Sequence, residues 1–361
     1  MRVVATNSLV PGAVLAKTIY NENGRALLQQ GVAFTPRMIE RLRSFDITYV
    51  YIEDGRTSDI IVDSPLAEKT RMKAIHSIKQ SFSNIHHSVV SEHRYVLEET
   101  GNELQEVVRS LIKELRNNGE VISLLSDVFT HDDYIFTHSL NVTMYALALG
   151  KELHLTPPKM EALGLGAILH DVGKMNVPRE ILFKPGKLTV DEFRRIQTHT
   201  DDGFEILRQT PNIPLLAAHC AYQHHERLDG SGYPRGIRSD DIHLFGKILG
   251  IADVFDAVTS NRVYREAMLP HEGLEILYSG SGSLFDQHMV EAFRRCIAVY
   301  PNGVSVQLDD GREAIVVKQN PYLCDRPVIR EIKRDGTRGR DIDLSKELNV
   351  MIANCHLTSV S

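Results

Sequence analysis

The spacing of apolar residues changes along the chain, and the first stretch predicts short strands with one helix. The segments "AVLAKTIY" (13–20), "RALLQQG" (25–31) and "ITYVYIED" (47–54) have the composition of strands. Between them, "TPRMIERLRSF" (35–45) has a threonine suited to cap a helix and a proline suited to its first turn. We therefore expect residues 1–63 to form a small α+β module with a regulatory or structural role.

A longer period begins near Ser64. The segments "AEKTRMKAIHSIKQSFSNI" and "GNELQEVVRSLIKELRNNG" place apolar residues at helical spacing, with charges on the opposite face. We expect residues 64–117 to form a helical linker that either dimerises or packs within the chain. Such a linker is also a possible contact for signalling partners. Residues 118–300 continue as a helical block and are assigned to one catalytic domain.

In the last segment of the chain, apolar and polar residues alternate again. "GVSVQLDDGREAIVVKQN" predicts a β-hairpin with its turn near Gly311, and "RPVIREIKRDG" predicts another strand. We expect residues 301–361 to form a β-rich extension and assign no structure to the tail from Ser345. The whole pattern predicts a mainly α protein: an all-helical bundle with a small N-terminal α+β module and a short C-terminal β extension.

Composition narrows the classes of function. The chain has 361 residues, of which 42% are hydrophobic, and its formal net charge of −6 argues against a binder of nucleic-acid polymers. No run approaches the roughly 18 apolar residues of a membrane span, and "MRVVATNSLVPG" lacks the apolar core of a signal peptide. We therefore expect a cytoplasmic protein without membrane insertion. Its four cysteines form no CxxC pair and are expected to be reduced thiols.

Two motifs suggest metal chemistry. In "ALGLGAILHDVGK" a helix of small and apolar residues ends at His170 and Asp171, and a buried carboxylate requires a cation or hydrogen-bond donors. In "HHERLDGSGYPRG" two adjacent histidines, His224 and His225, precede a glycine-rich turn. An ordinary core histidine or a surface turn would explain either half of this second motif by itself. The chain carries 16 histidines, and they point to a site only if they converge.

Three further segments offer candidate ligands. In "LTVDEFRRIQTHTDDGFEIL" the spacing predicts one helix with Phe193 and His199 on its inward face. His138 lies in the apolar "FTHSLNVTMYALALG", and for either histidine alone a hydrogen-bonded core position is the ordinary explanation. In "KILGIADVFDAVTS" Asp253 and Asp256 are three residues apart on one face of an apolar helix. Two carboxylates on a buried face require a cation or a basic ligand.

Together these candidates exceed the needs of a single ion. Five imidazoles (His138, His170, His199, His224 and His225) and two carboxylates (Asp171 and Asp253) outnumber the four ligands of a structural zinc. They suit two metals that share a bridging carboxylate, for which we choose Asp171. Nitrogen and oxygen ligands without thiolate are compatible with iron, manganese, nickel or zinc. We favour iron or manganese, with two divalent ions per chain.

These motifs resemble a known family. His170-Asp171 followed by "GK" resembles the signature of the HD phosphohydrolase superfamily, and "HHE" followed by "DGSGYP" resembles its HD-GYP branch, the bacterial cyclic-di-GMP phosphodiesterases. The resemblance covers about Asn118 to Tyr300 and implies an all-α, HD-type catalytic bundle. Position by position, it implies metal ligation by His138, His170, Asp171, His199, His224, His225 and Asp253. It also implies substrate contacts from Lys174, Gly232, Tyr233, Asp256, Arg262 and Arg265.

One position departs from the family pattern. Some members carry a glutamate that ligates a third metal four residues before the position of His138, where this chain has Tyr134. Asp132 and Asp133 are adjacent, but a shift of one residue on a helix turns a side chain by about 100 degrees. We therefore expect a binuclear site, and as a consequence a reaction that stops largely at pGpG instead of proceeding to GMP.

The expected reaction is hydrolysis of cyclic-di-GMP by a hydroxide that bridges the two metals at Asp171, while Lys174 stabilises charge on the phosphoryl oxygens. Three alternatives remain open. The same centre could act on another cyclic dinucleotide, or the domain could be a metal-loaded receptor for cyclic-di-GMP with negligible turnover. The third is a helical protein whose histidines are incidental.

Overall fold

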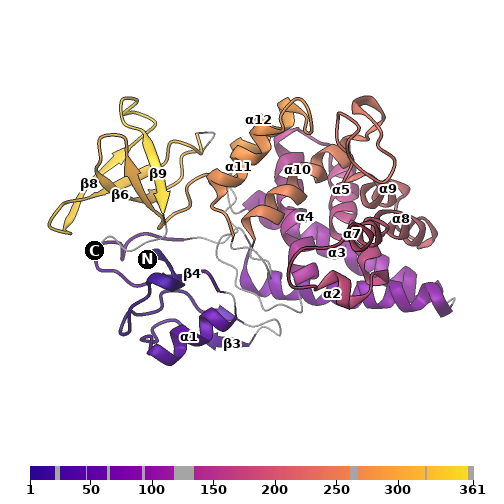
Figure 1. The fold of residues 1–361 in the computed structure, drawn as a ribbon, viewed down its shortest axis with the longest axis horizontal. Coiled ribbons are helices and arrows are strands. Elements are labelled where there is room, and N and C mark those ends of the chain that lie inside the picture. Colours follow the sequence, from indigo (N-terminus) through magenta and orange to yellow (C-terminus); the bar gives the residue numbers. More distant parts are fainter. Residues whose placement is uncertain are drawn as a thin grey trace.

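In a computed structural model of the chain, a helical block and a smaller β-containing unit lie side by side (Figure 1). The structure describes residues 1–20, 25–45, 47–62, 66–91, 94–117, 134–260, 267–321 and 323–356. Helices dominate the middle of the chain and strands occur towards both ends, which confirms the predicted mainly α fold class. No helix within those ranges has the length and apolarity that crossing a bilayer requires.

The helical block is built around one helix that is buried along nearly its whole length. In α4 every residue from Ile135 to Gly150 is buried, so its apolar residues need no single face. The elements of the block are α2 (Glu68–Ser91), α3 (Arg94–Asn117), α4 (Tyr134–Glu152), α5 (Pro157–Leu169), η3 (Val172–Asn176), α6 (Arg179–Leu182), α7 (Val190–Gln197), α8 (His199–Gln209), α9 (Leu215–Gln223), η4 (Ser239–Asp241), α10 (Leu244–Thr259), α11 (Pro270–Ser279) and α12 (Gln287–Cys296).

Small residues let the helices of the block approach closely. A Cβ atom added to Gly166 of α5 would lie 2.3 Å from the Cys220 sulfur of α9, and one added to Gly164 would lie 2.5 Å from a methyl group of Val108 in α3. Neither distance is possible for a real side chain. The glycines of "ALGLGAILHD" therefore fix how deeply α5 sits between α3 and α9, and the end of α5 carries two of the candidate ligands.

The helices α2 and α3 use their apolar faces inside the chain. Phe82 of α2 and Leu104 and Leu111 of α3 are buried in the same core as α4 and α5. These residues pack within the chain, which was one of the two predicted alternatives for this segment, the other being dimerisation. A homodimer through the same helices stays a prediction.

Within the described residues the strands form three sheets. The antiparallel pair β1 (Arg2–Ala5) and β4 (Tyr49–Ile52) and the pair β2 (Ile19–Tyr20) and β3 (Ala26–Leu28) lie near the start of the chain with η1 (Thr6–Ser8) and α1 (Pro36–Ser44). The third is a five-stranded antiparallel sheet in the order β8-β7-β6-β5-β9, made of β5 (Ser305–Leu308), β6 (Glu313–Lys318), β7 (Val328–Ile332), β8 (Arg338–Asp343) and β9 (Ile352–His356).

Several local predictions at the two ends are confirmed. Thr35 caps α1, and its hydroxyl accepts a hydrogen bond from the amide of Met38 at 3.3 Å. The hairpin of β5 and β6 turns at Gly311, whose φ of +83° is a conformation that glycine adopts without strain. Two strands were not predicted, β1 at the start of the chain and β9 in the tail from Ser345, and each pairs with a strand distant in sequence.

The two ends of the chain join into one body, here called the terminal unit (residues 1–62 and 301–356). The amide of Val3 donates to the carbonyl of Gly303 at 2.9 Å. Val3 and Tyr51 share an apolar core with residues of the five-stranded sheet such as Val306 and Ile329. Residues 1–63 and 301–361 were predicted as separate segments, whereas the structure joins them through contacts that the alternation of apolar and polar residues does not reveal.

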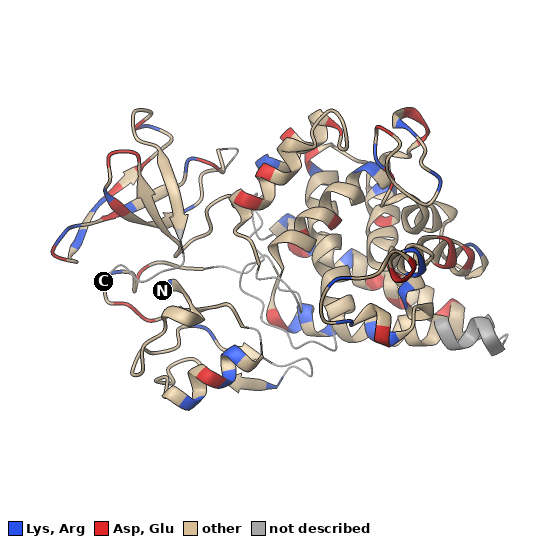
Figure 2. Ribbon diagram, in the orientation of Figure 1, with Lys and Arg blue, Asp and Glu red and all other residues tan. Residues whose placement is uncertain are grey.

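A buried arginine ties the two parts of the terminal unit together. Arg330 of β7 is only 1% exposed. Its guanidinium donates to both carboxylate oxygens of Asp59, at 2.6 and 2.9 Å, and to both of Asp341, at 2.7 and 2.9 Å. Basic and acidic positions alternate along the ribbon of the whole molecule, as Figure 2 shows, so this cluster of opposite charges stands out by the burial of its arginine and not by its composition. Charge-assisted bidentate pairs of this kind are among the stronger polar contacts in proteins.

Replacing Arg330 with alanine is expected to destabilise the terminal unit by about 1–3 kcal/mol, because it removes the hydrogen bonds to both carboxylates and leaves a void. The partly exposed carboxylates can recover water, which keeps the loss moderate. Hydrogen–deuterium exchange of the peptides that cover β6 and β7 measures the effect, with the exposed Arg340→Ala as the matched control. Equal protection in the two variants would contradict this role.

Candidate metal centre

The end of α5 delivers two candidate ligands into the centre of the helical block. The helix ends at Leu169, and His170 and Asp171 follow it, both buried. Beyond them, Gly173 passes so close to α8 that an added Cβ would lie 2.0 Å from the carbonyl oxygen of His199. The glycine of "HDVGK" is therefore required for the contact between η3 and the start of α8.

Three of the histidines are oriented by the backbone. The Nδ1–H of His170 donates to the carbonyl of Ala167 at 2.7 Å, and that of His199 to Ile196 at 2.7 Å. His224 makes the same kind of bond to Cys220 at 3.1 Å. A donor at Nδ1 leaves the lone pair at Nε2 free to face the site. Each of these rings is thus held in the form that binds a metal.

Asp171 lies between two groups of histidines. Its Oδ1 is 3.4 Å from the Nε2 atom of His199 and 3.8 Å from that of His224. Its Oδ2 is 3.4 Å from the Nε2 atom of His170 and 3.6 Å from that of His138. Each carboxylate oxygen therefore faces a different pair of imidazoles, which is the arrangement expected of a carboxylate shared by two ions.

The ligand atoms gather into two groups with atoms that lie within 4.8 Å of one another: His199, His224 and His225 in one, and His138, His170 and Asp171 in the other. Asp253 approaches both groups, because its Oδ1 is 3.1 Å from His138 Nε2 and its Oδ2 is 3.7 Å from His225 Nδ1. The structure thus brings together all seven residues predicted as ligands.

Burial keeps most of the imidazoles neutral. It lowers the pKa of His170, lowers that of His199 to about 4, and holds those of His224 and His225 well below their usual value. A neutral imidazole is the form that ligates a metal. Burial also disfavours charge on His138, but its hydrogen bonds to Asp253 and Asp256 outweigh that effect and raise its pKa to about 9.

The carboxylates keep their charge in spite of burial. Burial alone would raise the pKa of Asp171, but the nearby Lys174 ammonium and the surrounding histidines hold it well below its usual range. Burial would likewise raise the pKa of Asp253, and the hydrogen bond from His138 is the main cause that lowers it. Negative charge and imidazole lone pairs therefore face a common interior space.

Buried atoms without a partner test whether cations fit here. The Nε2 atom of His170 and the Oδ1 atom of Asp171 are buried and make no hydrogen bond. Orphaned polar atoms of this kind are rare in a folded interior. Both atoms can donate an electron pair and neither is a thiolate, so they fit a divalent cation of borderline or harder character.

The glycine-rich turn packs against the segment that contains His224, His225 and Glu226. Glu226, which is buried, accepts hydrogen bonds from the amides of Arg235 at 2.9 Å and Ile237 at 3.1 Å. A Cβ added to Gly232 would lie 2.4 Å from the carbonyl oxygen of His225. The turn therefore lies directly against the "HHE" segment.

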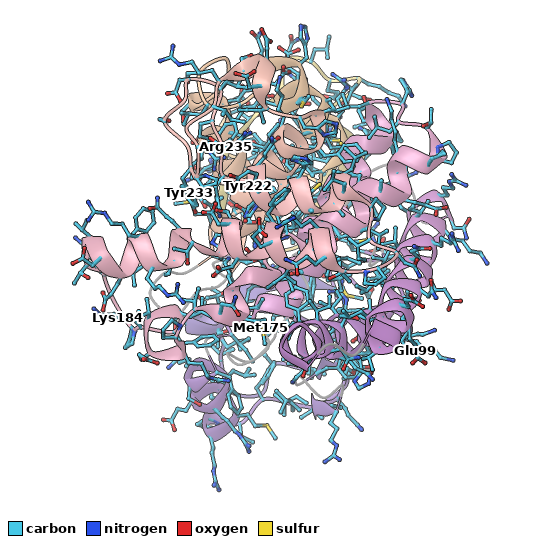
Figure 3. The ribbon with its side chains drawn as sticks, turned by 90° about the vertical axis from the view of Figure 1, so that its right-hand side faces the viewer. Glu99, Met175, Lys184, Tyr222, Tyr233 and Arg235 are labelled. Carbon is cyan, nitrogen blue, oxygen red and sulfur yellow. The ribbon has the colours of Figure 1, made fainter. Side chains whose placement is uncertain are left out.

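Tyr233 of this turn covers one ligand. Its ring stacks on that of His225 with centroids 4.5 Å apart and an interplanar angle of 28°. Burial raises the pKa of the Tyr233 hydroxyl, so it stays protonated and able to donate. Two residues further along the turn, the Arg235 guanidinium lies 5.1 Å from the centre of the Tyr222 ring, and Figure 3 labels all three residues. This edge offers aromatic faces and a cation next to the cluster.

Two predicted contact residues have defined places. The ammonium of Lys174 lies 2.5 Å from Asp171 Oδ2 at the edge of the cluster. Asp256 does not face the cluster, since its carboxylate lies behind His138 with both oxygens already bonded. Arg262 and Arg265 lie outside the described residues, as do Asp132 and Asp133. Tyr134 stacks on His138 with ring centroids 5.6 Å apart.

One local prediction was wrong. The segment around His199 is not a single helix, because α7 ends at Gln197 and α8 begins at His199. Phe193, expected on an inward face, is 47% exposed. The capping box of Thr189 and Glu192 starts α7 as a separate short helix, and the contact of Gly173 with His199 sets the start of α8.

Sequence reasoning also missed three residues that support the site. Glu226 holds the turn, Asn141 bonds the carboxylate behind His138, and Arg227 donates from one nitrogen to the carbonyls of His224 and Glu226 at 3.1 and 2.8 Å. Glu226 and Arg227 were visible in "HHER", and Asn141 follows His138 by one helical turn. The spacing of residues in the sequence does not reveal which groups these three side chains contact.

Known proteins resemble this chain over the same region. A family model described as "HD domain" matches residues 104–289. "Cyclic di-GMP phosphodiesterase PA4108" of Pseudomonas aeruginosa is 36% identical over 206 residues, which are 57% of this chain and 49% of that protein. "Cyclic di-GMP phosphodiesterase" of Thermotoga maritima is 32% identical over 243 residues, 65% of this chain and 64% of that protein.

One further relative and one solved structure are also similar to this chain. "3'3'-cGAMP-specific phosphodiesterase 1" of Vibrio cholerae is 42% identical over 144 residues, 40% of this chain and 33% of that protein. Among solved structures, Bd1817 from Bdellovibrio bacteriovorus matches with a TM-score of 0.49 and 16% identity, over 81% of this chain and 97% of that one. The chain spans 49% and 64% of the length of the first two relatives.

Replacing Gly173 with alanine is expected to push η3 away from α8 and thereby separate Asp171 from His199. We expect the affinity for Mn²⁺ to fall at least about tenfold, the scale seen when the support of a metal ligand is lost. Metal titration of the purified apoprotein measures it. The control is Gly55→Ala, where an added Cβ meets nothing within 4 Å; equal affinities in the two variants would refute the steric argument.

Proposed function

The chain belongs to the HD domain family, and we propose that it is a metal-dependent phosphodiesterase that hydrolyses cyclic-di-GMP. The observation that carries this proposal is the position of Asp171, whose two oxygens face separate sets of imidazoles. The substrate comes from the relatives, several of which are named cyclic di-GMP phosphodiesterases.

The proposed ligands of two divalent metals, with iron or manganese favoured, are His138, His170, Asp171, His199, His224, His225 and Asp253. When bound, such metals supply an activated water and neutralise charge on the phosphoryl oxygens. Asp171 would serve as the shared ligand between the two positions. Burial keeps four of the histidines neutral. This favours metal binding, because none of these four rings has to lose a proton first.

The other proposed roles follow from charge and position. Lys174 lies at the edge of the cluster and is suited to hold a non-bridging phosphate oxygen as a point charge. Gly232 permits close approach of the turn, and Tyr233 offers a ring face and a hydroxyl to the substrate. Arg262 and Arg265 are proposed as contacts for a second phosphate.

A second candidate function is hydrolysis of a mixed cyclic dinucleotide. It is favoured by the similarity to three proteins of Vibrio cholerae named 3'3'-cGAMP-specific phosphodiesterases. A receptor with negligible turnover is a third candidate. All three candidate functions would use the same ligand cluster, so the cluster does not choose among them. Turnover and binding measured on a panel of cyclic dinucleotides separate the three functions.

Replacing Asp171 with alanine is expected to abolish hydrolysis of cyclic-di-GMP and to reduce bound metal at the same time, because one side chain serves both ions. The assay uses anaerobically purified protein loaded with iron or with manganese, and chromatography resolves pGpG from GMP. We expect pGpG as the main product. Asp240→Asn, an exposed acid of η4, is the control. Full activity in Asp171→Ala would remove the basis of the proposal, and binding without turnover in the wild type would favour the receptor.

Two tightly bound metal ions per chain are expected, because Tyr134 occupies the position at which some family members carry a third-metal ligand. Its ring packs against His138 and presents no carboxylate. Metal analysis of the protein after dialysis against a weak chelator tests this stoichiometry. Three retained ions per chain would contradict the binuclear site.

A further inference from the structure

Asp256 is buried directly behind His138. It follows Asp253 by one turn of α10 and is 1% exposed. Its Oδ2 lies 2.6 Å from the Nδ1 atom of His138. Its Oδ1 accepts hydrogen bonds from Asn141 at 3.0 Å and from Ser260 at 2.9 Å. Both oxygens are therefore occupied by donors of the protein itself.

His138 differs in this respect from the neighbouring ligands. The Nδ1 atoms of His170, His199 and His224 are bonded to backbone carbonyls three or four residues earlier in the chain. His138 uses a carboxylate from a different helix. Such a carboxylate fixes which nitrogen carries the proton and increases the basicity of the other one, which is the nitrogen that faces the metal.

The support of Asp256 is itself built into the fold. Asn141 lies one turn after His138 on α4, so the imidazole and the amide reach the same carboxylate from one helix face. Ser260 lies just beyond the end of α10 and closes the third side. The carboxylate thus links α4 to α10 at the level of the cluster.

We propose that Asp256, held by Asn141 and Ser260, is a positioning residue that keeps the His138 proton on Nδ1 and presents Nε2 to the metal. This inference rests on the proposed function, because it assumes that His138 is a ligand. It differs from the substrate contact that the family resemblance implied for Asp256, since that role requires a carboxylate oxygen open to the substrate.

The test is Mn²⁺ titration of the full-chain apoprotein, followed by the electron paramagnetic resonance signal of free Mn²⁺. Asp256→Ala is expected to weaken binding of one of the two ions by about 10–100-fold, the range for loss of a partner that orients a ligand. Asn141→Ala leaves the carboxylate in place and is expected to weaken the same ion less. Asp240→Asn is the control and is expected to match the wild type.

Kinetics separate this role from its alternative. If both ions bind Asp256→Ala and Asn141→Ala with wild-type affinity, the positioning role is overturned, and a raised KM for cyclic-di-GMP would then assign Asp256 to the substrate. If Asp256→Ala does not fold, native Mn²⁺ affinity in Asn141→Ala would by itself overturn the proposal. A wild-type protein that binds two ions and hydrolyses no dinucleotide would refute the proposed function while the affinity comparison still tests Asp256.

Discussion

The structure of the helical block depends on the burial of two carboxylates among imidazoles. An ionised carboxylate far from water is unfavourable unless a cation or donors compensate it. Without metal, Asp171 is compensated by Lys174, and Asp253 by His138. Both compensating groups have a second role in the proposed reaction: Lys174 would contact a phosphate, and His138 would bind a metal. A bound cation pair would replace them as compensating charge and leave the Lys174 ammonium available to a phosphate.

Close backbone contacts give this electrostatic centre its precision. Gly173 brings η3 onto α8, and Gly232 brings the turn onto His225. In each case a side chain would have to occupy the position of a backbone atom. The rings of His170 and His224 in turn bond carbonyls of the helices that end just before them, and the ring of His199 bonds a carbonyl of the preceding helix α7. Ligand geometry is therefore set by helix packing rather than by mobile loops.

Much of this site could be predicted because its chemistry is local in sequence. The family resemblance is confirmed, and the seven predicted ligands converge. Most of the errors concern features that depend on distant partners, whereas the break between α7 and α8 follows in part from the local capping box of Thr189 and Glu192. A separation of three residues turns a helical side chain by about 60 degrees from its starting direction, which is enough for Asp253 to face the cluster while Asp256 lies behind His138. The strands β1 and β9 were missed because they exist through pairing with β4 and β5, far away in the chain.

The terminal unit connects to the site through two helices. Its first part leads towards α2, and its second part follows α12. Both helices pack on α4, which carries His138, and α2 also contacts η3, which carries Lys174. Because the two parts are joined by Arg330 and a shared core, the segment that leads towards α2 and the segment that follows α12 belong to one packed unit. These two helices lie against the elements that carry the compensating groups of Asp253 and Asp171.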